Sequence, residues 1–395
     1  MATFERPLVN ELMEALVRKP PLLEIVVGAR QTGKSTAADQ VASRWGGPVR
    51  QASADLALPP GPEWIETQWA LARRDADSSG APALLVLDEV QKVHGWSETV
   101  KALWDEDRRI KRKIRPLLLG SSALLMRRGL TESLAGRFFL HRCPHWSYAE
   151  CRDAFGWNLD QWLFFGGYPG AAAFSSDERS WRRYVADSLI ETAIARDVLA
   201  LERIGKPPLL RQLFGLAARH PAEILSYTKM VGTLKDAGNT VTLAHYLELL
   251  EACFLVSGLR RLTGKPRQRG SSPKLVLWNN ALVTALSGLS FEQARADGSF
   301  WGRLVENAAG AHLLGFLPPP LFEVGYWRDR NDEVDFVVKT GKKRFAIEVK
   351  SGRPQRPKGL AAFRSRFPDA QALIVGSGGV ALEDFFSSSP EALLI

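Results

Sequence analysis

Short apolar runs alternate with longer polar segments in the first third of the chain. Runs at 23–27 (LEIVV), 83–88 (ALLVLD) and 117–119 (LLL) contain no alternation of polar and apolar residues. Strands of a parallel sheet have this continuous apolar character, because helices cover both faces. A helix is expected over 35–45. Strands that alternate with helices predict a doubly wound α/β sheet.

The pattern becomes helical after Pro144. A segment with glycines and a proline at 162–171 interrupts it, and an amphipathic stretch at 181–201 resumes it. Three further helices are predicted, at 209–219, 222–235 and 240–252. Alternating residues then flank a turn rich in Gly, Lys, Pro and Arg. Three helices and a hairpin have the outline of a winged helix, and a generic helical lid or linker is the alternative.

A second α/β pattern occupies the C-terminal part. A helix at 301–314 is expected to precede strands at 322–327, 333–339 and 344–350, a helix at 357–367 and a strand at 371–376. These elements predict a second α/β domain with a core of its own.

The composition is that of an ordinary soluble protein, with 45% hydrophobic and 24% charged residues. No apolar run approaches the ~20 residues that span a bilayer. The first 19 residues predict an amphipathic helix without the apolar core of a signal peptide. We therefore expect a cytoplasmic protein with no membrane partner. Cys143, Cys151 and Cys253 fit neither a disulfide framework nor a metal spacing, which predicts reduced, buried thiols.

The net charge of +9 favours polyanionic partners. Six positive charges lie within eight positions: Arg108, Arg109, Lys111, Arg112, Lys113 and Arg115. A looser second cluster consists of Arg260, Arg261, Lys265, Arg267, Arg269 and Lys274. Each cluster fits either a DNA contact or a solubilising surface.

The segment GARQTGKS at 28–35 matches the P-loop pattern in full, between a predicted strand and a predicted helix. Its glycines allow backbone N–H groups to converge on phosphate oxygens at the positive end of a helix. A chance glycine-rich turn is the alternative. The residues expected to bind the nucleotide are Gly28, Gly33, Lys34, Ser35, Thr36 and, further along, Ser121. Lys34 is expected on the β- and γ-phosphates, and Ser35 on Mg²⁺.

Two adjacent carboxylates end the strand at 83–88. Asp88 is expected to hold the magnesium shell, and Glu89 to orient and deprotonate the attacking water. An adjacent Asp-Glu pair favours an ATP-hydrolysing class over kinases or GTPases. An ordinary acidic loop residue is the alternative for Glu89.

Two later positions are candidates for contacts with the γ-phosphate. Ser121 and Ser122 follow the strand at 117–119, where a polar sensor or a simple helix cap would lie. Arg137 resembles the arginine finger that one subunit inserts into the site of its neighbour. Such a finger predicts a homo-oligomer, and a salt bridge within the same domain is the alternative.

Acidic and basic residues gather on the predicted C-terminal hairpin. Glu348 and Lys350 point the same way along one strand, and Asp335 can lie on the same face of the neighbouring strand. Two carboxylates and a lysine fit metal-dependent phosphodiester hydrolysis, with Asp335 and Glu348 as metal ligands. Glu306, on the preceding helix, is a fourth candidate. A salt bridge at the edge of the hairpin is the alternative.

Together these motifs resemble a bacterial and archaeal family of AAA-type ATPases that end in a restriction-endonuclease-like domain of the PD-(D/E)xK group. The resemblance covers nearly the whole chain. It is carried by GARQTGKS, LLVLDEVQK, LLLGSSALL, ESLAGRF, FGGYPGA, ETAIARDV, GRLVENAAGAHLL, YWRDRNDEVDFVV and FAIEVKSG. It implies an AAA-type domain at 1–150, a helical, winged-helix-like part at 151–285 and a restriction-endonuclease-like domain at 286–395.

The resemblance also implies roles for single residues. Gly33, Lys34, Ser35 and Asp88 would bind phosphate and magnesium, and Glu89 would act in hydrolysis. On the nuclease-group motif fall Asp335, Glu348 and Lys350. The family often has an aspartate where this chain has the run Trp278–Asn280, which removes an acidic role there.

The function expected from these features is a DNA-acting ATPase with ATP and Mg²⁺ as cofactors, remodelling branched DNA in recombination or repair. Two alternatives stay open. One is an ATP-driven regulatory switch that binds a protein partner, and the other is a defence nuclease gated by ATP.

Overall fold

The computed structural model describes residues 4–120, 133–199, 204–262, 271–352 and 358–394. The chain divides into two compact units, Met1–Cys143 and Pro144–Ile395. The first unit ends at Cys143, and the domain boundary expected at residue 150 stays a prediction. The boundary expected between 285 and 286 falls inside the second unit, because one sheet contains strands from both sides of it.

The first unit is built on five parallel strands. Their order is β2 (Val49–Ser53), β3 (Ala83–Asp88), β4 (Ile114–Gly120), β1 (Leu23–Gly28) and β5 (Phe138–Cys143). A short 3-10 turn, η1 (Val90–Lys92), follows β3.

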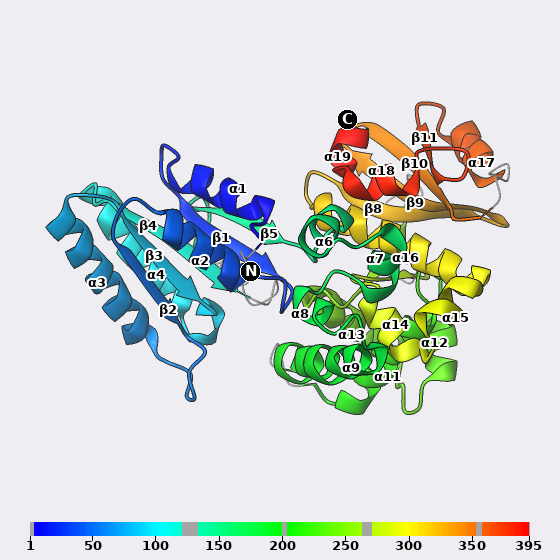
Figure 1. The fold of residues 1–395 in the computed structure, drawn as a ribbon, viewed down its shortest axis with the longest axis horizontal. Helices are drawn as coiled ribbons and strands as arrows, with labels where there is room; N and C mark the ends of the chain where they lie inside the picture. The colour runs from blue at the N-terminus through cyan, green and yellow to red at the C-terminus, as the bar shows by residue number, and fades with distance from the viewer. Residues whose placement is uncertain (1–3, 121–132, 200–203, 263–270, 353–357, 395) are drawn as a thin grey trace. The chain divides into compact units, whose positions relative to one another are not determined.

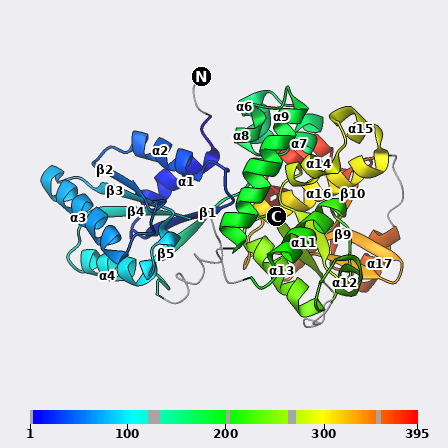
Figure 2. The same ribbon diagram turned by 90° about the horizontal axis from the view of Figure 1, so that it is seen from below.

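Helices cover both faces of this sheet (Figure 1, Figure 2). One face packs against α1 (Pro7–Leu16) and α2 (Lys34–Arg44), with Val26, Leu84 and Leu117 among the buried residues between them. The other face packs against α3 (Pro62–Ser79) and α4 (Trp96–Arg109). The prediction of a doubly wound parallel α/β domain is therefore confirmed.

The second unit begins with helices. They are α6 (Tyr148–Phe155), α7 (Leu159–Phe165), α8 (Pro169–Ala172) and α9 (Glu178–Arg183), followed by two π-helical segments, η2 (Tyr184–Ile190) and η3 (Ala193–Val198). Capping boxes at Ser147 and Asn158 begin α6 and α7, because each side chain accepts a hydrogen bond from the backbone N–H three residues later.

Three helices and a hairpin follow, near the predicted positions. They are α11 (Pro207–Arg219), α12 (Tyr227–Thr233), α13 (Thr240–Ala252), β6 (Val256–Arg261) and β7 (Lys274–Leu277). The strands β6 and β7 pair antiparallel. The elements of the winged-helix prediction are present, and that fold remains a prediction.

The hairpin belongs to a six-stranded sheet whose order is β11, β10, β9, β8, β6 and β7. After α14 (Ala281–Ser287), α15 (Phe291–Ala296) and α16 (Gly298–Phe316), the chain adds β8 (Glu323–Asp329), β9 (Asp332–Thr340), β10 (Lys343–Lys350), α17 (Lys358–Arg366), β11 (Gln371–Gly376), α18 (Leu382–Ser387) and α19 (Pro390–Leu394). β6 pairs parallel with β8 through Arg260 and Arg261. One sheet therefore crosses the expected boundary at 285.

Two further expectations concern the chain as a whole. Among the residues that the structure describes, no helix is long and apolar enough to cross a membrane. Cys143, Cys151 and Cys253 are all buried, as expected.

Candidate functional site

Two glycines shape the P-loop between β1 and α2. Gly33 has a φ of 90° directly before the helix, a conformation that favours glycine. A Cβ at Gly28 would lie 2.1 Å from the carbonyl oxygen of Cys143, so the close approach of β5 excludes a side chain. The loop therefore leads directly to the N-terminus of α2, where the helix dipole and exposed N–H groups favour anions.

Lys34, the first residue of α2, lies beneath this loop and is 7% exposed. Its Nζ donates to the backbone oxygens of Gly28 (3.0 Å) and Ala29 (2.7 Å). Carbonyl oxygens are partners that an ammonium group can exchange for phosphate oxygens. The lysine is thus held at the position where the motif requires a cation.

The side chains of Ser35 and Asp88 contact each other at the carboxyl ends of the strands, although the two residues lie 53 positions apart in the sequence. The Ser35 hydroxyl donates to Asp88 Oδ2 at 2.6 Å, and the other carboxylate oxygen accepts from the N–H of Glu89 at 2.8 Å. A hydroxyl and a carboxylate beside a phosphate cradle are the protein groups that hold Mg²⁺ in P-loop enzymes. The residues therefore fit this ion. Thr36, the next residue of α2, is exposed.

Glu89 has an unusual backbone conformation, with a φ of 53°. Residues other than glycine adopt this left-handed region at a cost, and such residues cluster at functional sites. Its Oε2 accepts a hydrogen bond from Gln91 Nε2 at 2.5 Å. Gln91 was not among the expected site residues. The polar residue two positions after Glu89 in LLVLDEVQK was the signal that could have identified it.

Arg6 is a second residue that the sequence did not suggest. It is 4% exposed, and its Nη1 donates to the backbone oxygen of Thr32 (2.8 Å) and to Cys143 Sγ (2.9 Å). One arginine, just before α1, thus ties the P-loop to the end of β5. Its distance from the motif in the sequence hides this role.

Arg137 forms a bidentate ion pair with Asp105 of α4. Its Nε and Nη2 lie 2.7 and 3.0 Å from the two carboxylate oxygens. The structure thus shows the salt bridge that was the alternative to an arginine finger, and a finger role would require this pair to open. Ser121 and Ser122 lie outside the described residues.

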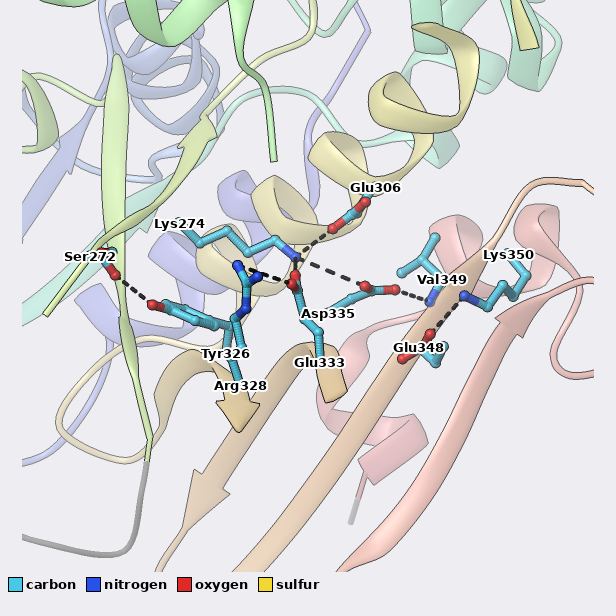
Figure 3. A network of polar contacts seen from close by, with 10 residues as sticks. All are labelled: Ser272, Lys274, Glu306, Tyr326, Arg328, Glu333, Asp335, Glu348, Val349 and Lys350. Carbon is cyan, nitrogen blue, oxygen red and sulfur yellow. Dashed lines mark hydrogen bonds and ion pairs between the residues drawn. The ribbon is translucent and has the colours of Figure 1, made fainter. Parts of the chain in front are cut away.

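In the second unit, Lys274 of β7 lies among three carboxylates (Figure 3). Its side chain is 0% exposed. Nζ lies 2.5 Å from Glu306 Oε1, 3.4 Å from Glu333 Oε1 and 3.9 Å from Asp335 Oδ1. The expectation that Lys274 contributes to a basic surface cluster is therefore wrong, because the sheet buries its side chain.

The four residues of the nuclease-like prediction lie in the same region (Figure 3). Asp335 Oδ2 accepts a hydrogen bond from the N–H of Val349 at 2.8 Å, and Lys350 Nζ lies 2.7 Å from Glu348 Oε1. We call this group, Lys274, Glu306, Glu333, Asp335, Glu348 and Lys350, the C-terminal ion cluster.

The pairing of β8 with β9 shifts register beside Asp335. The paired positions Gly325 and Trp327 of β8 lie two residues apart, whereas their partners Val337 and Val334 lie three residues apart in β9. The extra residue of β9 falls in the interval that contains Asp335. Bulges disrupt the ladder and redirect side chains, often beside functional sites.

Burial and mutual repulsion shift the pKa values of the cluster. Burial and the charge of Asp335 raise the pKa of Glu306 to about 7 against the opposing attraction of Lys274. The pKa of Lys274 is itself raised, because attraction to Glu306, Asp335 and Glu333 outweighs the effect of burial. Burial and Asp335 raise the pKa of Glu348. Lys274 is thus a permanent cation in this group.

The cluster does not fit a resident divalent metal ion. Within the described ranges, no group of three or more His, Cys, Asp or Glu side chains is arranged to hold one. An ammonium group, Lys274 Nζ, instead contacts three of the carboxylates. One buried oxygen, Glu348 Oε2, has no hydrogen-bond partner in the described part of the chain. Mg²⁺ takes six ligands in near-octahedral geometry, and the ammonium group of Lys274 already lies where these carboxylates converge.

The predicted basic clusters are only partly at the surface. Arg108, Arg109, Lys111 and Lys113 are exposed. Arg115 is half-buried and donates to the backbone oxygen of Leu16 at 2.9 Å, while Arg112 pairs with Asp77 and Asp107. In the second cluster Arg260 and Arg261 are exposed, and Lys265, Arg267 and Arg269 lie outside the described residues.

Family models match three successive parts of the chain. Residues 21–152 match a model described as an AAA domain, residues 156–293 a domain of unknown function (DUF8612), and residues 301–384 a domain of unknown function (DUF4143). The first match contains the P-loop and Asp88. Residues 21–152 are therefore an AAA-type P-loop domain, and the endonuclease-like identity of the C-terminal part remains a prediction.

One relative and several solved structures are similar over longer stretches. A protein of Haemophilus influenzae, described as uncharacterized, is 22% identical over 310 residues, which are 73% of this chain and 72% of the relative.

Three solved structures have TM-scores of 0.29, 0.32 and 0.34. They are the Aeropyrum pernix ORC1 protein in complex with DNA (15% identity, 73% of this chain and 93% of that one), AMPPCP-bound DnaA from Aquifex aeolicus (16%, 64% and 89%) and the Thermotoga maritima RuvB Holliday junction branch migration motor (15%, 67% and 89%). These similarities are too low to carry a conclusion about function.

Proposed function

We propose that this chain hydrolyses ATP in its AAA-type domain and uses the energy to act on DNA. The observation that carries the proposal is the contact of Ser35 with Asp88 at 2.6 Å, beside a P-loop that holds Lys34 beneath it. A chance glycine-rich turn would have no reason to bring a hydroxyl and a strand-end carboxylate together.

The residues divide the chemistry among them. Lys34 and the N–H groups at the start of α2 bind the phosphates, and Ser35 and Asp88 hold Mg²⁺. Mg²⁺ held there would supply positive charge to the phosphate oxygens during transfer. Glu89 takes a proton from the attacking water, and Gln91 is the positioning residue that orients its carboxylate.

Arg137 is proposed to complete the site of a neighbouring subunit once its pair with Asp105 opens. Arg137→Ala should then keep nucleotide affinity and lose turnover. Mixing Arg137→Ala with Glu89→Gln should restore some activity, because a mixed oligomer contains some sites with both groups intact. A strictly monomeric protein that hydrolyses ATP, measured by light scattering, would show that Arg137 is only a structural ion-pair residue.

The exposed basic residues are the proposed DNA contacts. Arg108, Arg109, Lys111 and Lys113 lie at the end of α4 and the turn that follows, and Arg260 and Arg261 lie on β6. Such residues bind the phosphate backbone without reading sequence. This mode suits branched DNA, whose shape rather than base order would be recognised. Remodelling of branched DNA in recombination or repair is the specific version that we favour.

Phosphate release should be measured without DNA and with single-stranded, duplex and four-way junction DNA. We expect DNA to raise the rate, with the largest effect for the junction, and Lys34→Ala to abolish it in every case. Equal rates in all four conditions would contradict the DNA role. A regulatory ATPase that binds a protein partner would then be the better description.

A further inference from the structure

We propose that Lys274 is the resident cation of the C-terminal ion cluster, in the place that a divalent metal ion would occupy in a nuclease-like site. The cluster would then hold no metal and cut no DNA. This inference does not depend on the ATPase function, because every residue involved lies in the second unit.

The contacts of Lys274 support this role. Its Nζ is fully buried and has Glu306, Glu333 and Asp335 around it, within 2.5 to 3.9 Å. It also lies 5.0 Å from the centre of the Phe336 ring, a favourable place for a cation. A buried ammonium with this many anionic partners is stable, whereas an unpaired one would lose its proton.

The chain's own cations already offset most of the carboxylates: three positive groups face four acidic ones. Four carboxylates, from Glu306, Glu333, Asp335 and Glu348, face two ammonium groups, from Lys274 and Lys350. Arg328 adds a third cation, 4.0 Å from Glu333. A divalent ion would have to displace Lys274 from Glu306, or bind beside a fixed positive charge that repels it.

The position of β7 in the sheet suggests that Lys274 has a structural role. β7 is the terminal strand of the six-stranded sheet, and it does not pair with β8, β9 or β10. Lys274 joins this strand to Glu306 of α16 and to Glu333 and Asp335 of β9. Because the cation is part of the chain, neither dilution nor a chelator can remove it.

Binding of Mn²⁺ tests the proposal directly. The loss of the free-Mn²⁺ signal in electron paramagnetic resonance would be followed in the nucleotide-free full chain. The variants are Lys274→Met, which keeps the length of the side chain, and Lys339→Met, which removes a cation of β9 that pairs with Glu323. A weak Mn²⁺ contribution from Ser35 and Asp88 would be common to all of them and cancels in the comparison.

We expect Lys274→Met to bind one Mn²⁺ more per chain than wild type and Lys339→Met. A further Asp335→Asn change should remove that additional ion. Mn²⁺ at millimolar concentration should raise the melting temperature of Lys274→Met by several degrees, because a ligand stabilises the state that binds it, and leave wild type unchanged.

Two results would overturn the proposal. The first is an Mn²⁺ ion bound by wild type and lost in Asp335→Asn, and the second is cleavage of supercoiled plasmid by wild type that Asp335→Asn abolishes. If Lys274→Met fails to fold, the comparison of wild type with Asp335→Asn decides alone. Equal Mn²⁺ binding by these two proteins supports Lys274 as the resident cation.

Discussion

Two buried lysines of this chain have opposite kinds of partner. Lys34 donates to the backbone oxygens of Gly28 and Ala29, at the N-terminus of a helix, which attracts anions. Lys274 lies against the carboxylates of Glu306, Glu333 and Asp335. Carbonyl oxygens can give way to a phosphate, whereas charged partners neutralise the ammonium permanently.

The difference shows why a motif alone does not establish a working site. Both regions contain the residue types that their chemistry needs, in the expected order. In the AAA-type domain these residues surround the P-loop, where the phosphates of a nucleotide would bind. In the C-terminal ion cluster a lysine from another strand already occupies the centre. We therefore propose a catalytic role for the first region and a structural role for the second.

Replacing each lysine by methionine should separate the two regions most strongly. Lys34→Met should weaken ATP binding by roughly 10²- to 10⁴-fold, since two hydrogen bonds from a charged group contribute about 1.5–3 kcal/mol each. Lys274→Met, in the other unit, should leave the affinity within about twofold. Equilibrium titration with a fluorescent ATP analogue measures both. Equal losses in the two variants would show that the regions are not independent.

Glu89→Gln should lower the turnover number on the order of 10²-fold, at the lower end of what a general base supplies. Nucleotide affinity should stay at the parent level, because the amide keeps the shape of the side chain and leaves Ser35 and Asp88 in place. Phosphate release beside equilibrium binding checks this. Hydrolysis at the parent rate would mean that another group activates the water.

The stability of the AAA-type domain should depend on pH through His141 of β5. Its ring nitrogens lie 2.5 Å from Glu11 and 2.8 Å from Glu24. Burial opposes protonation most strongly, but the hydrogen bonds and charges of Glu11 and Glu24 together outweigh it, so the pKa of His141 is raised above 6.5.

A raised pKa of the folded state stabilises the protein below pH 6.5, and the contribution is lost as pH rises through the folded value. Urea unfolding from pH 6 to pH 9 should therefore show falling stability. The loss should be on the order of 1–3 kcal/mol, typical of a hydrogen bond to a charged group. His141→Gln should remove this dependence. If the variant and wild type lose stability in parallel as pH rises, residues other than His141 cause the pH dependence.

Charge reversal of the exposed pair on β6 should have the smallest effect. Arg260→Glu with Arg261→Glu should flatten the dependence of DNA affinity on salt, by roughly 0.9 log units per log unit of salt for each phosphate that the variant no longer neutralises. Arg108→Glu with Arg109→Glu, at the other proposed contact, is the matched comparison in the first unit. An unchanged slope for the first pair and a flatter slope for the second would place the DNA at the end of α4 instead.

Local patterns predicted the continuous apolar elements well and the half-buried ones poorly. The strand predicted at 83–88 coincides with β3, and the strand predicted at 23–27 lies within β1 (Leu23–Gly28). β2 was not predicted, because its sequence VRQAS has no apolar run and its burial is partial. Such an edge strand depends on pairing with β3, which no short window of sequence contains.

The positions of the proposed nucleotide-site residues were predictable because they depend on local sequence, while their roles stay predictions. Lys34, Ser35, Asp88 and Glu89 belong to motifs whose spacing is fixed by one loop and one strand end. The position of Lys274 depends on Glu306 and Asp335, which are 32 and 61 residues away. From its neighbours in the sequence, Lys274 resembled one more surface cation. Only the pairing of distant strands shows that the sheet buries it.

The number of Mn²⁺ ions bound by wild type, with and without a non-hydrolysable ATP analogue, tests the contrast between the two regions most directly. We predict one ion per chain with the analogue, held where Ser35 meets Asp88, and no tightly bound ion without it. An ion that is retained without nucleotide and lost in Asp335→Asn would contradict this contrast, because it would place a working metal site in the C-terminal ion cluster.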